Sequence, residues 1–250
     1  MDRLTDRRVL VVGASSGLGL AAAQAIAAEG AHTCFAARRR DRIEAAARAA
    51  GEKHLAVVCD VRDESSCRAA VARTVEAFGR LDAVVYAPGI SSFCPIEEID
   101  AATWREVLDT NLIGASLVLN SAIAHLDASA GKAVVMSSIV IDDRPPRPEQ
   151  ATYVVSKVAL ETLVQAWQGE HRRVSFTTMA IGDALSEFGV GLDPAKLAHI
   201  VERWSAEGYM YGRMMDAESV AAEVVNALAS RETIRRIAIT PRYQESESAE

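Results

Sequence analysis

RVLVVGASSGLG, residues 8–19, is the stretch that decides the fold of this 250-residue chain. It begins as an apolar run with the length of a buried strand, and Leu18, Ala22 and Ile26 then recur at the spacing of a helix with one apolar face. The glycines between strand and helix permit a tight turn, in which a pyrophosphate can approach the backbone N–H groups at the helix N-terminus. Because the glycine spacing is G-x-x-x-G-x-G and not G-x-G-x-x-G, the loop taken alone also fits a turn that binds nothing.

The pattern of strand, helix and glycine repeats after this stretch. Strand-like apolar runs at 33–37, 55–59 and 83–86 alternate with helical patterns that end before Gly51 and Gly79. Strands that are apolar throughout are buried on both faces, which indicates a parallel sheet between two layers of helices. Further strands are expected at 132–137, 174–180 and 234–240, and further helices at 101–126, 152–169 and 217–229. The sequence therefore predicts one doubly wound α/β domain over residues 1–250, with about seven strands.

Composition narrows the function classes. Half of the residues are apolar and the formal net charge is −7, so we expect a soluble protein that does not bind nucleic acid or an anionic membrane. No uninterrupted apolar run reaches the roughly 18 residues of a membrane helix, and the N-terminus lacks a signal-peptide core. The four cysteines form no C-x-x-C pair, so no metal site is predicted and a cytoplasmic location is expected. The acidic, polar end, residues 244–250, is expected to be a flexible tail.

An ordered set of polar residues follows the glycine loop. Asn111, Ser138 and Tyr153-x-x-x-Lys157 stand at matching places in the βα pattern. Together with the loop, this set resembles the short-chain dehydrogenase/reductase family. The resemblance implies an oxidoreductase that interconverts a carbonyl and a secondary or primary alcohol by hydride transfer. Two alternatives remain: a catalytically silent cofactor-binding sensor or scaffold of the same fold, and a related long-chain epimerase or dehydratase, which would have a different glycine spacing.

The catalytic group is expected on one helix face. Tyr153 and Lys157 are four residues apart, so their side chains are neighbours. Tyrosine titrates near 10 and is a poor base at neutral pH, but Lys157 and an oxidised nicotinamide would favour its phenolate. The resemblance implies that Tyr153 is the acid/base, Ser138 binds the substrate oxygen, Lys157 also holds the nicotinamide ribose, and Asn111 holds a water that links Lys157 to solvent.

The end of the second strand predicts the cofactor. It continues Ala37-Arg38-Arg39, without the acidic residue that favours NAD(H), and guanidinium groups can bind the extra phosphate of NADP(H). The alternative is a solvated helix start. By resemblance, Arg38 and Ser15 would hold that phosphate and Asp60 would meet the adenine amino group. The predicted cofactor contacts are Gly13, Ser15, Ser16, Gly17, Leu18, Gly19, Arg38, Arg39, Asp60, Val61, Ala87, Gly89, Tyr153, Lys157, Ile181 and Gly182.

The chain departs from the family pattern near the substrate. Tyr86-Ala87-Pro88-Gly89 replaces the usual Asn-Asn-Ala-Gly, and a Pro-rich, charged loop at 142–148 lengthens the link between Ser138 and Tyr153. Residues 183–215 lie where the family keeps its variable substrate lid, although they also fit a helix pair that packs its own core. The predicted pocket residues for a small carbonyl or alcohol are Phe93, Ile139, Phe188, Tyr209 and Tyr211. A homodimer or homotetramer built on the long helices is expected.

Overall fold

The computed structural model describes residues 3–189 and 192–243. In chain order its elements are β1 (Arg8–Val12), α1 (Gly17–Ala28), β2 (His32–Ala37), α2 (Arg40–Ala50), β3 (Leu55–Val58), α3 (Glu64–Phe78), β4 (Ala83–Tyr86), η1 (Ile96–Glu98), α4 (Ala101–Leu108), η2 (Asp109–Ile113), α5 (Gly114–Ser129), β5 (Lys132–Ser138), η3 (Ile139–Ile141), α6 (Ala151–Glu170), β6 (Ser175–Ile181), α7 (Pro194–Ala206), α8 (Ala217–Ala229) and β7 (Arg236–Ile239). The tail predicted at 244–250 lies outside the described residues.

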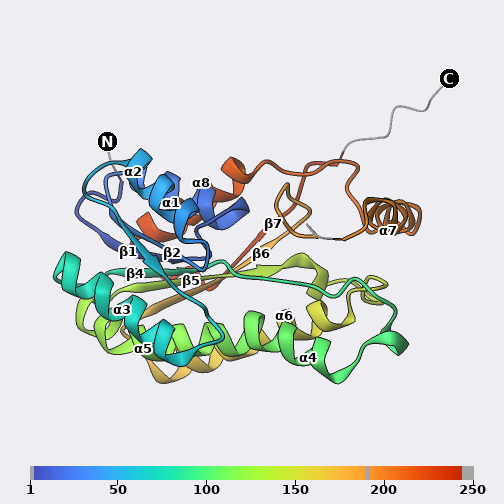
Figure 1. Cartoon of the computed structure of the whole chain (residues 1–250), viewed down its shortest axis with the longest axis horizontal. Coiled ribbons are helices and arrows are strands. Elements are labelled where there is room, and N and C mark those ends of the chain that lie inside the picture. The colour runs from blue at the N-terminus through green and yellow to red at the C-terminus, as the bar shows by residue number, and fades with distance from the viewer. Residues whose placement is uncertain (1–2, 190–191, 244–250) are drawn as a thin grey trace.

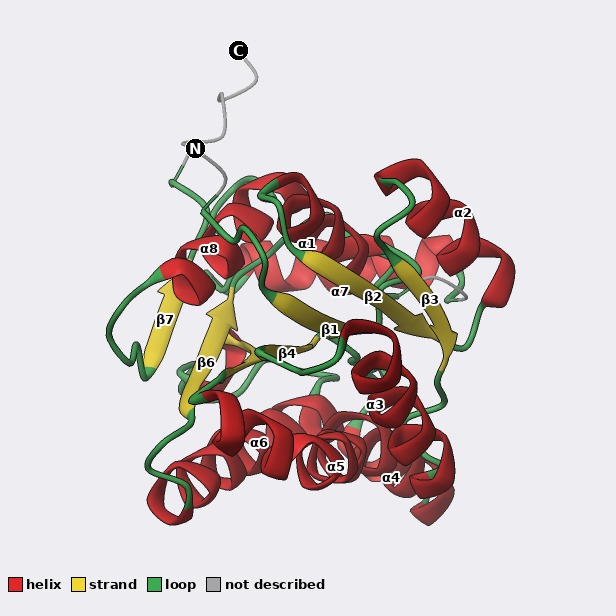
Figure 2. Ribbon diagram, turned by 90° about the vertical axis from the view of Figure 1, so that its left-hand side faces the viewer, coloured by secondary structure: helices red, strands yellow, loops and turns green. Residues whose placement is uncertain are grey.

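All seven strands run parallel in one sheet, in the order β3-β2-β1-β4-β5-β6-β7. Helices α1, α2 and α8 cover one face, and α3, α5 and α6 cover the other (Figures 1 and 2). The strand order reverses between β1 and β4, which is the switch point where open α/β sheets bind ligands. The predicted doubly wound parallel fold is confirmed.

Two cores explain why the strands are apolar throughout. Val9 and Val11 of β1 point into a core with α1 and α8, whereas Leu10 and Val12 point into a core with α3 and α5. The helices meet the sheet largely through small side chains, such as Ala22 of α1, which is fully buried. Alanine therefore fills the space between the layers, and few aromatic residues are needed there.

The helix expected over 101–126 is present but contains an irregular turn. A π-helical turn at Asp109–Ile113 separates α4 from α5, and it contains the buried Asn111. Such turns widen a helix by one residue and free backbone groups for other partners. The long helix predicted here is confirmed, but periodicity did not detect the single residue that the π-helical turn inserts.

By length and composition, the helical segment Ala101–Ser129 could cross a membrane, with a mean hydropathy of 1.4 over its most apolar window. Because it contains Arg105 and Asp109, the segment is not an uninterrupted apolar run. Its α5 part buries Val118, Leu119 and Leu126 against the sheet, as a core helix does.

Candidate active site

A cavity of about 700 Å³ lies at the carboxyl ends of the strands. One end is lined by the glycine turn and the end of β2, and the other by the start of α6 and the segment 183–215. It brings together every predicted cofactor contact and three of the four predicted catalytic residues. The exception is Asn111, which lies behind the cavity wall.

The glycine turn is fixed by backbone geometry. Gly13 and Gly17 have φ angles of +86° and +52°, which side-chain-bearing residues rarely adopt. A Cβ on Gly19 would lie 2.3 Å from the Gly13 carbonyl oxygen, so α1 can approach β1 this closely only with glycine there. Ser16 makes no side-chain capping bond to the described helix α1, whose first N–H groups face the cavity and can receive an anion.

Basic side chains lie beside this turn. Arg39 donates from Nε and Nη2 to the Ser15 hydroxyl, at 3.1 and 2.9 Å, and from Nη1 to Glu187 at 2.7 Å. The Arg38 guanidinium is exposed and has no ion-pair or hydrogen-bond partner within residues 3–189 and 192–243. The structure thus places Ser15 on Arg39, whereas sequence analysis linked it with Arg38.

Glu187 is a contact that sequence analysis missed. It comes from the segment 183–215 and bridges Arg39 and Arg42, which lies 2.6 Å from its other oxygen. Hydrogen bonds from these two guanidinium groups lower the pKa of Glu187 to about 2. No local sequence pattern could have predicted this contact, because Glu187 and Arg42 are 145 residues apart.

Asp60 lines the cavity at the predicted adenine end, but it is already paired. Arg62 donates from Nε and Nη2 to the two Asp60 oxygens, at 3.1 and 2.9 Å. These hydrogen bonds lower the Asp60 pKa. Each carboxylate oxygen can accept further hydrogen bonds, so the pair leaves acceptor capacity at this end.

The predicted catalytic residues Ser138, Tyr153 and Lys157 meet where β5 ends and α6 begins. The Lys157 ammonium lies 5.6 Å from the Tyr153 ring centroid and donates to the Met136 carbonyl at 2.8 Å. Burial raises the pKa of Tyr153 to about 12, against the opposing effects of the Ser138 hydrogen bond and the Arg147 charge. Burial also lowers the pKa of Lys157 to about 8, with Glu161 opposing it. The charge that opposes burial at Tyr153 is that of Arg147, which sequence analysis did not place beside it.

Asn111 acts on the cavity wall through its neighbours. Its Oδ1 accepts from the Ile90 N–H and its Nδ2 donates to the Ile90 carbonyl, both at 2.9 Å, and Nδ2 also donates to Ser156. The π-helical turn is braced from β4, because Tyr86 donates its hydroxyl proton to the Thr110 carbonyl. Tyr86 therefore supplies a brace where the family pattern has asparagine.

The substrate end is lined partly as predicted. Phe93, Ile139 and Phe188 are cavity residues, and the Phe188 ring centroid lies 4.8 Å from that of Tyr153. Tyr209 and Tyr211 lie outside the cavity lining. Tyr209 turns toward the Pro-rich loop and donates its hydroxyl proton to the Pro145 carbonyl. The lining residues that the predicted set lacked include Arg147, Gln150, Asp183, Leu197, Val201, Trp204, Met210 and Met214.

Comparisons with known proteins agree with this arrangement. The family model of the short chain dehydrogenases matches residues 7–189. An uncharacterised oxidoreductase of Methylorubrum extorquens is 33% identical over 193 residues, 75% of this chain and 77% of the relative. Cis-4-hydroxycyclohexanecarboxylate dehydrogenase of Sinomonas cyclohexanicum is 32% identical over 168 residues, 66% of this chain and 67% of the relative. An alcohol dehydrogenase from the archaeon Thermococcus sibiricus, solved in complex with 5-hydroxy-NADP, has a TM-score of 0.81 at 26% identity, covering 96% of this chain and 99% of that one.

Proposed function

This chain belongs to the short-chain dehydrogenase family of oxidoreductases, and from that premise we propose that it is an NADP(H)-dependent enzyme that interconverts a carbonyl group and an alcohol. One observation carries the proposal. Ser138, Tyr153 and Lys157 line the same cavity as the glycine turn and the basic side chains at the end of β2. A group that can donate a proton to a carbonyl oxygen and residues that can bind a nucleotide therefore line the same cavity.

The choice of NADP(H) rests on the residues at the β2 end. An acidic residue there would favour NAD(H), whereas this chain has Ala37 followed by two arginines. Arg38 is exposed and lines the cavity, so it would supply a permanent charge for the 2′-phosphate. Arg39 holds the Ser15 hydroxyl by two hydrogen bonds, and this hydroxyl would contact the same phosphate. The α1 N-terminus would hold the pyrophosphate and Asp60 would accept from the adenine amino group.

The proposed chemistry is general-acid reduction. NADPH, when bound, supplies the hydride. Tyr153 donates its proton to the carbonyl oxygen, and Ser138 donates a hydrogen bond to the same atom, which stabilises the charge that develops there. Lys157 stabilises the phenolate left on Tyr153, and Asn111 holds a water that returns the proton from solvent. At neutral pH Tyr153 carries the proton that reduction of a carbonyl requires.

The test is a panel of ketones, aldehydes, acyl thioesters and steroids, each offered with NADPH and with NADH, followed by absorbance at the nicotinamide band. We expect oxidation of NADPH with at least one carbonyl class and a weak response with NADH. Tight NADPH binding without any turnover on the panel would instead support the silent sensor or scaffold.

Arg38→Ala tests the cofactor choice. Losing a charge-assisted bond to phosphate removes roughly 1.5–3 kcal/mol, so NADPH binding should weaken by about ten- to a hundredfold while NADH binding stays unchanged. Arg40→Ala is the matched control, because Arg40 points to Glu44 on the surface of α2. Equal affinity of the unaltered protein for the two cofactors would contradict the proposal.

A further inference from the structure

Arg147 is a buried cation in the Pro-rich loop that lengthens the link between β5 and α6. Its side chain is 1% exposed, although three prolines surround it in the loop sequence Pro145-Pro146-Arg147-Pro148. A guanidinium loses its hydration on burial, which is tolerated only when its N–H groups are paired. The partners of Arg147 therefore indicate which segments this loop contacts.

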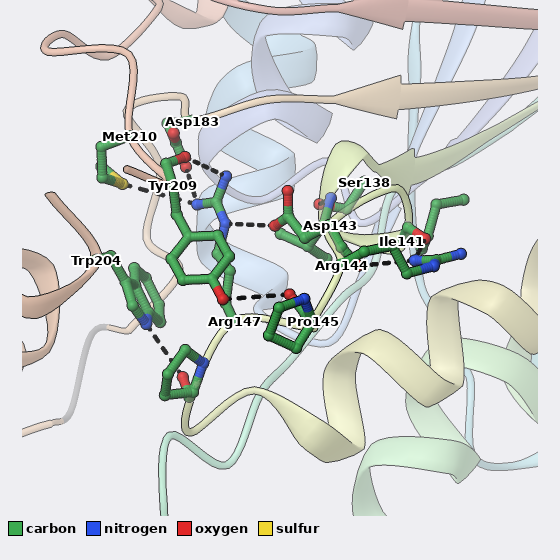
Figure 3. A network of polar contacts seen from close by, with 12 residues as sticks. Ser138, Ile141, Asp143, Arg144, Pro145, Arg147, Asp183, Trp204, Tyr209 and Met210 are labelled. Carbon is green, nitrogen blue, oxygen red and sulfur yellow. Dashed lines mark hydrogen bonds and ion pairs between the residues drawn. The ribbon is translucent and has the colours of Figure 1, made fainter. Parts of the chain in front are cut away.

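The partners come from three separate segments (Figure 3). Nε donates to Asp143 of the same loop at 2.8 Å, and Nη1 donates to Asp183, just beyond the end of β6, at 2.7 Å. Nη2 donates to the carbonyl of Tyr209 at 2.9 Å. One side chain thus ties the Pro-rich loop to both ends of the segment 183–215, which we call the lid.

Aromatic residues of the lid close around the same guanidinium. Its central carbon lies 5.7 Å from the Trp204 ring centroid and 6.0 Å from that of Tyr209, within cation–π range. Both rings also bond back to the loop: the Trp204 indole N–H donates to the Pro148 carbonyl, and the Tyr209 hydroxyl donates to the Pro145 carbonyl. The lid is therefore held to the loop by four hydrogen bonds and two cation–π contacts in and around Arg147.

A run of edge-to-face and tilted ring contacts connects this cluster to Tyr153. The Trp204 ring lies 6.2 Å from Phe93, Phe93 lies 5.2 Å from Phe188, and Phe188 lies 4.8 Å from Tyr153, all between centroids. Phe93 has a φ of +49°, so its backbone is held in a region that costs energy and must be kept there by its contacts. A shift of the lid would move the ring that packs on Tyr153.

We propose that Arg147 is a positioning residue, a clasp that holds the lid against the loop after β5 and so fixes the cavity wall that places the substrate over Tyr153. Asp143 and Asp183 give the cluster a net negative charge, so Arg147 does not serve as an anchor for a substrate carboxylate. The effect on turnover rests on the proposed carbonyl chemistry, whereas the effect on the lid does not.

Hydrogen–deuterium exchange of the intact protein tests the clasp without a substrate. Arg147→Met should speed exchange in residues 192–215 by about tenfold or more, because it leaves two carboxylates unpaired. Arg147→Lys keeps the charge without the planar fork and should show an intermediate effect, so the test survives if the methionine variant does not fold. Lys196→Met is the control, since Lys196 is exposed on α7 of the same lid and no ion pair or hydrogen bond joins it to the described loop 142–150.

Steady-state kinetics separate positioning from general damage. In Arg147→Met, the KM for the carbonyl substrate should rise by about tenfold or more, with a smaller fall in kcat and unchanged NADPH affinity, and Arg147→Lys should restore part of the loss. If the unaltered protein reduces no carbonyl compound, the proposed function fails while the exchange result still stands. Lid exchange that is the same in both Arg147 variants as in the unaltered protein overturns the clasp, whatever the activity.

Discussion

The cavity has two walls of different construction. The glycine-turn wall, residues 13–19 with the end of β2, is built from backbone, and its positive φ angles fall on Gly13 and Gly17. The lid wall, residues 142–150, 183–189 and 192–215, is built from side chains that meet across the chain, and its loop places a positive φ of +62° on Glu149. Glycine adopts this conformation without strain, whereas glutamate pays roughly 1 kcal/mol. The first wall is therefore sensitive to an added Cβ, and the second to a lost contact.

Tyr153 lies where the two walls meet, and its removal should have the largest effect. Tyr153→Phe keeps the ring that packs on Phe188 but removes the proton donor, so turnover should fall by on the order of a hundred- to ten-thousand-fold. NADPH affinity, measured by fluorescence titration, should not change, because the glycine-turn wall is intact. A variant with near-normal turnover would show that another group protonates the substrate.

Gly19→Ala tests the glycine-turn wall directly. The new Cβ would meet the Gly13 carbonyl oxygen at 2.3 Å, and neither backbone can move without breaking the turn. We expect the free energy of unfolding to fall by about 3 kcal/mol and NADPH binding to be lost. Gly169→Ala in α6 is the control: nothing lies within 4 Å of its Cβ, so alanine should stabilise the helix by up to about 1 kcal/mol.

Lys157 is buried beside Tyr153, and the pH dependence of stability should show that burial has lowered its pKa. Its pKa is lowered to about 8 by burial, below the value near 10.5 in the unfolded chain, so the native state binds fewer protons between these values. The free energy of unfolding should therefore rise by about 2 kcal/mol from pH 8 to pH 10, relative to Lys157→Met. Turnover should fall over the same range as the ammonium loses its proton. Parallel stability curves for the two proteins would contradict the shifted pKa.

Sequence patterns predicted the glycine-turn wall well because its information is local. A strand, a turn that needs glycine and a helix follow one another within residues 8–28, and the second strand ends in arginines just after it. The parallel sheet follows from the same reasoning, since strands buried on both faces must be apolar throughout. The sequence also predicted that Tyr153 and Lys157, the proposed catalytic pair, are neighbours, because residues four apart in a helix lie on one face.

The lid wall could not be predicted, because each of its main contacts joins distant residues. Arg147 and Asp183 are 36 residues apart, and Arg39 and Glu187 are 148 apart. Tyr209 and Tyr211 looked like pocket residues by their size alone, yet partners in the Pro-rich loop turn Tyr209 away from the cavity. Composition predicts bulky residues near a substrate, but only the three-dimensional partners decide which of them face it.

Glu187→Gln should change cofactor affinity less than the other variants change their readouts. It tests whether the two walls act separately, because Glu187 of the lid forms an ion pair with Arg39 at the glycine-turn wall. Its carboxylate lies 2.7 Å from Arg39 and 2.6 Å from Arg42, so it would compete for Arg39 with the 2′-phosphate of the proposed NADP(H). The pair is partly exposed, so its loss is worth at most about 1 kcal/mol, and NADPH should bind up to about fivefold more tightly with NADH unchanged. Glu44→Gln, which removes an exposed partner of Arg40, is the control. Weaker NADPH binding in Glu187→Gln would instead mean that the lid holds Arg39 in its binding orientation, and the two walls would then act as one.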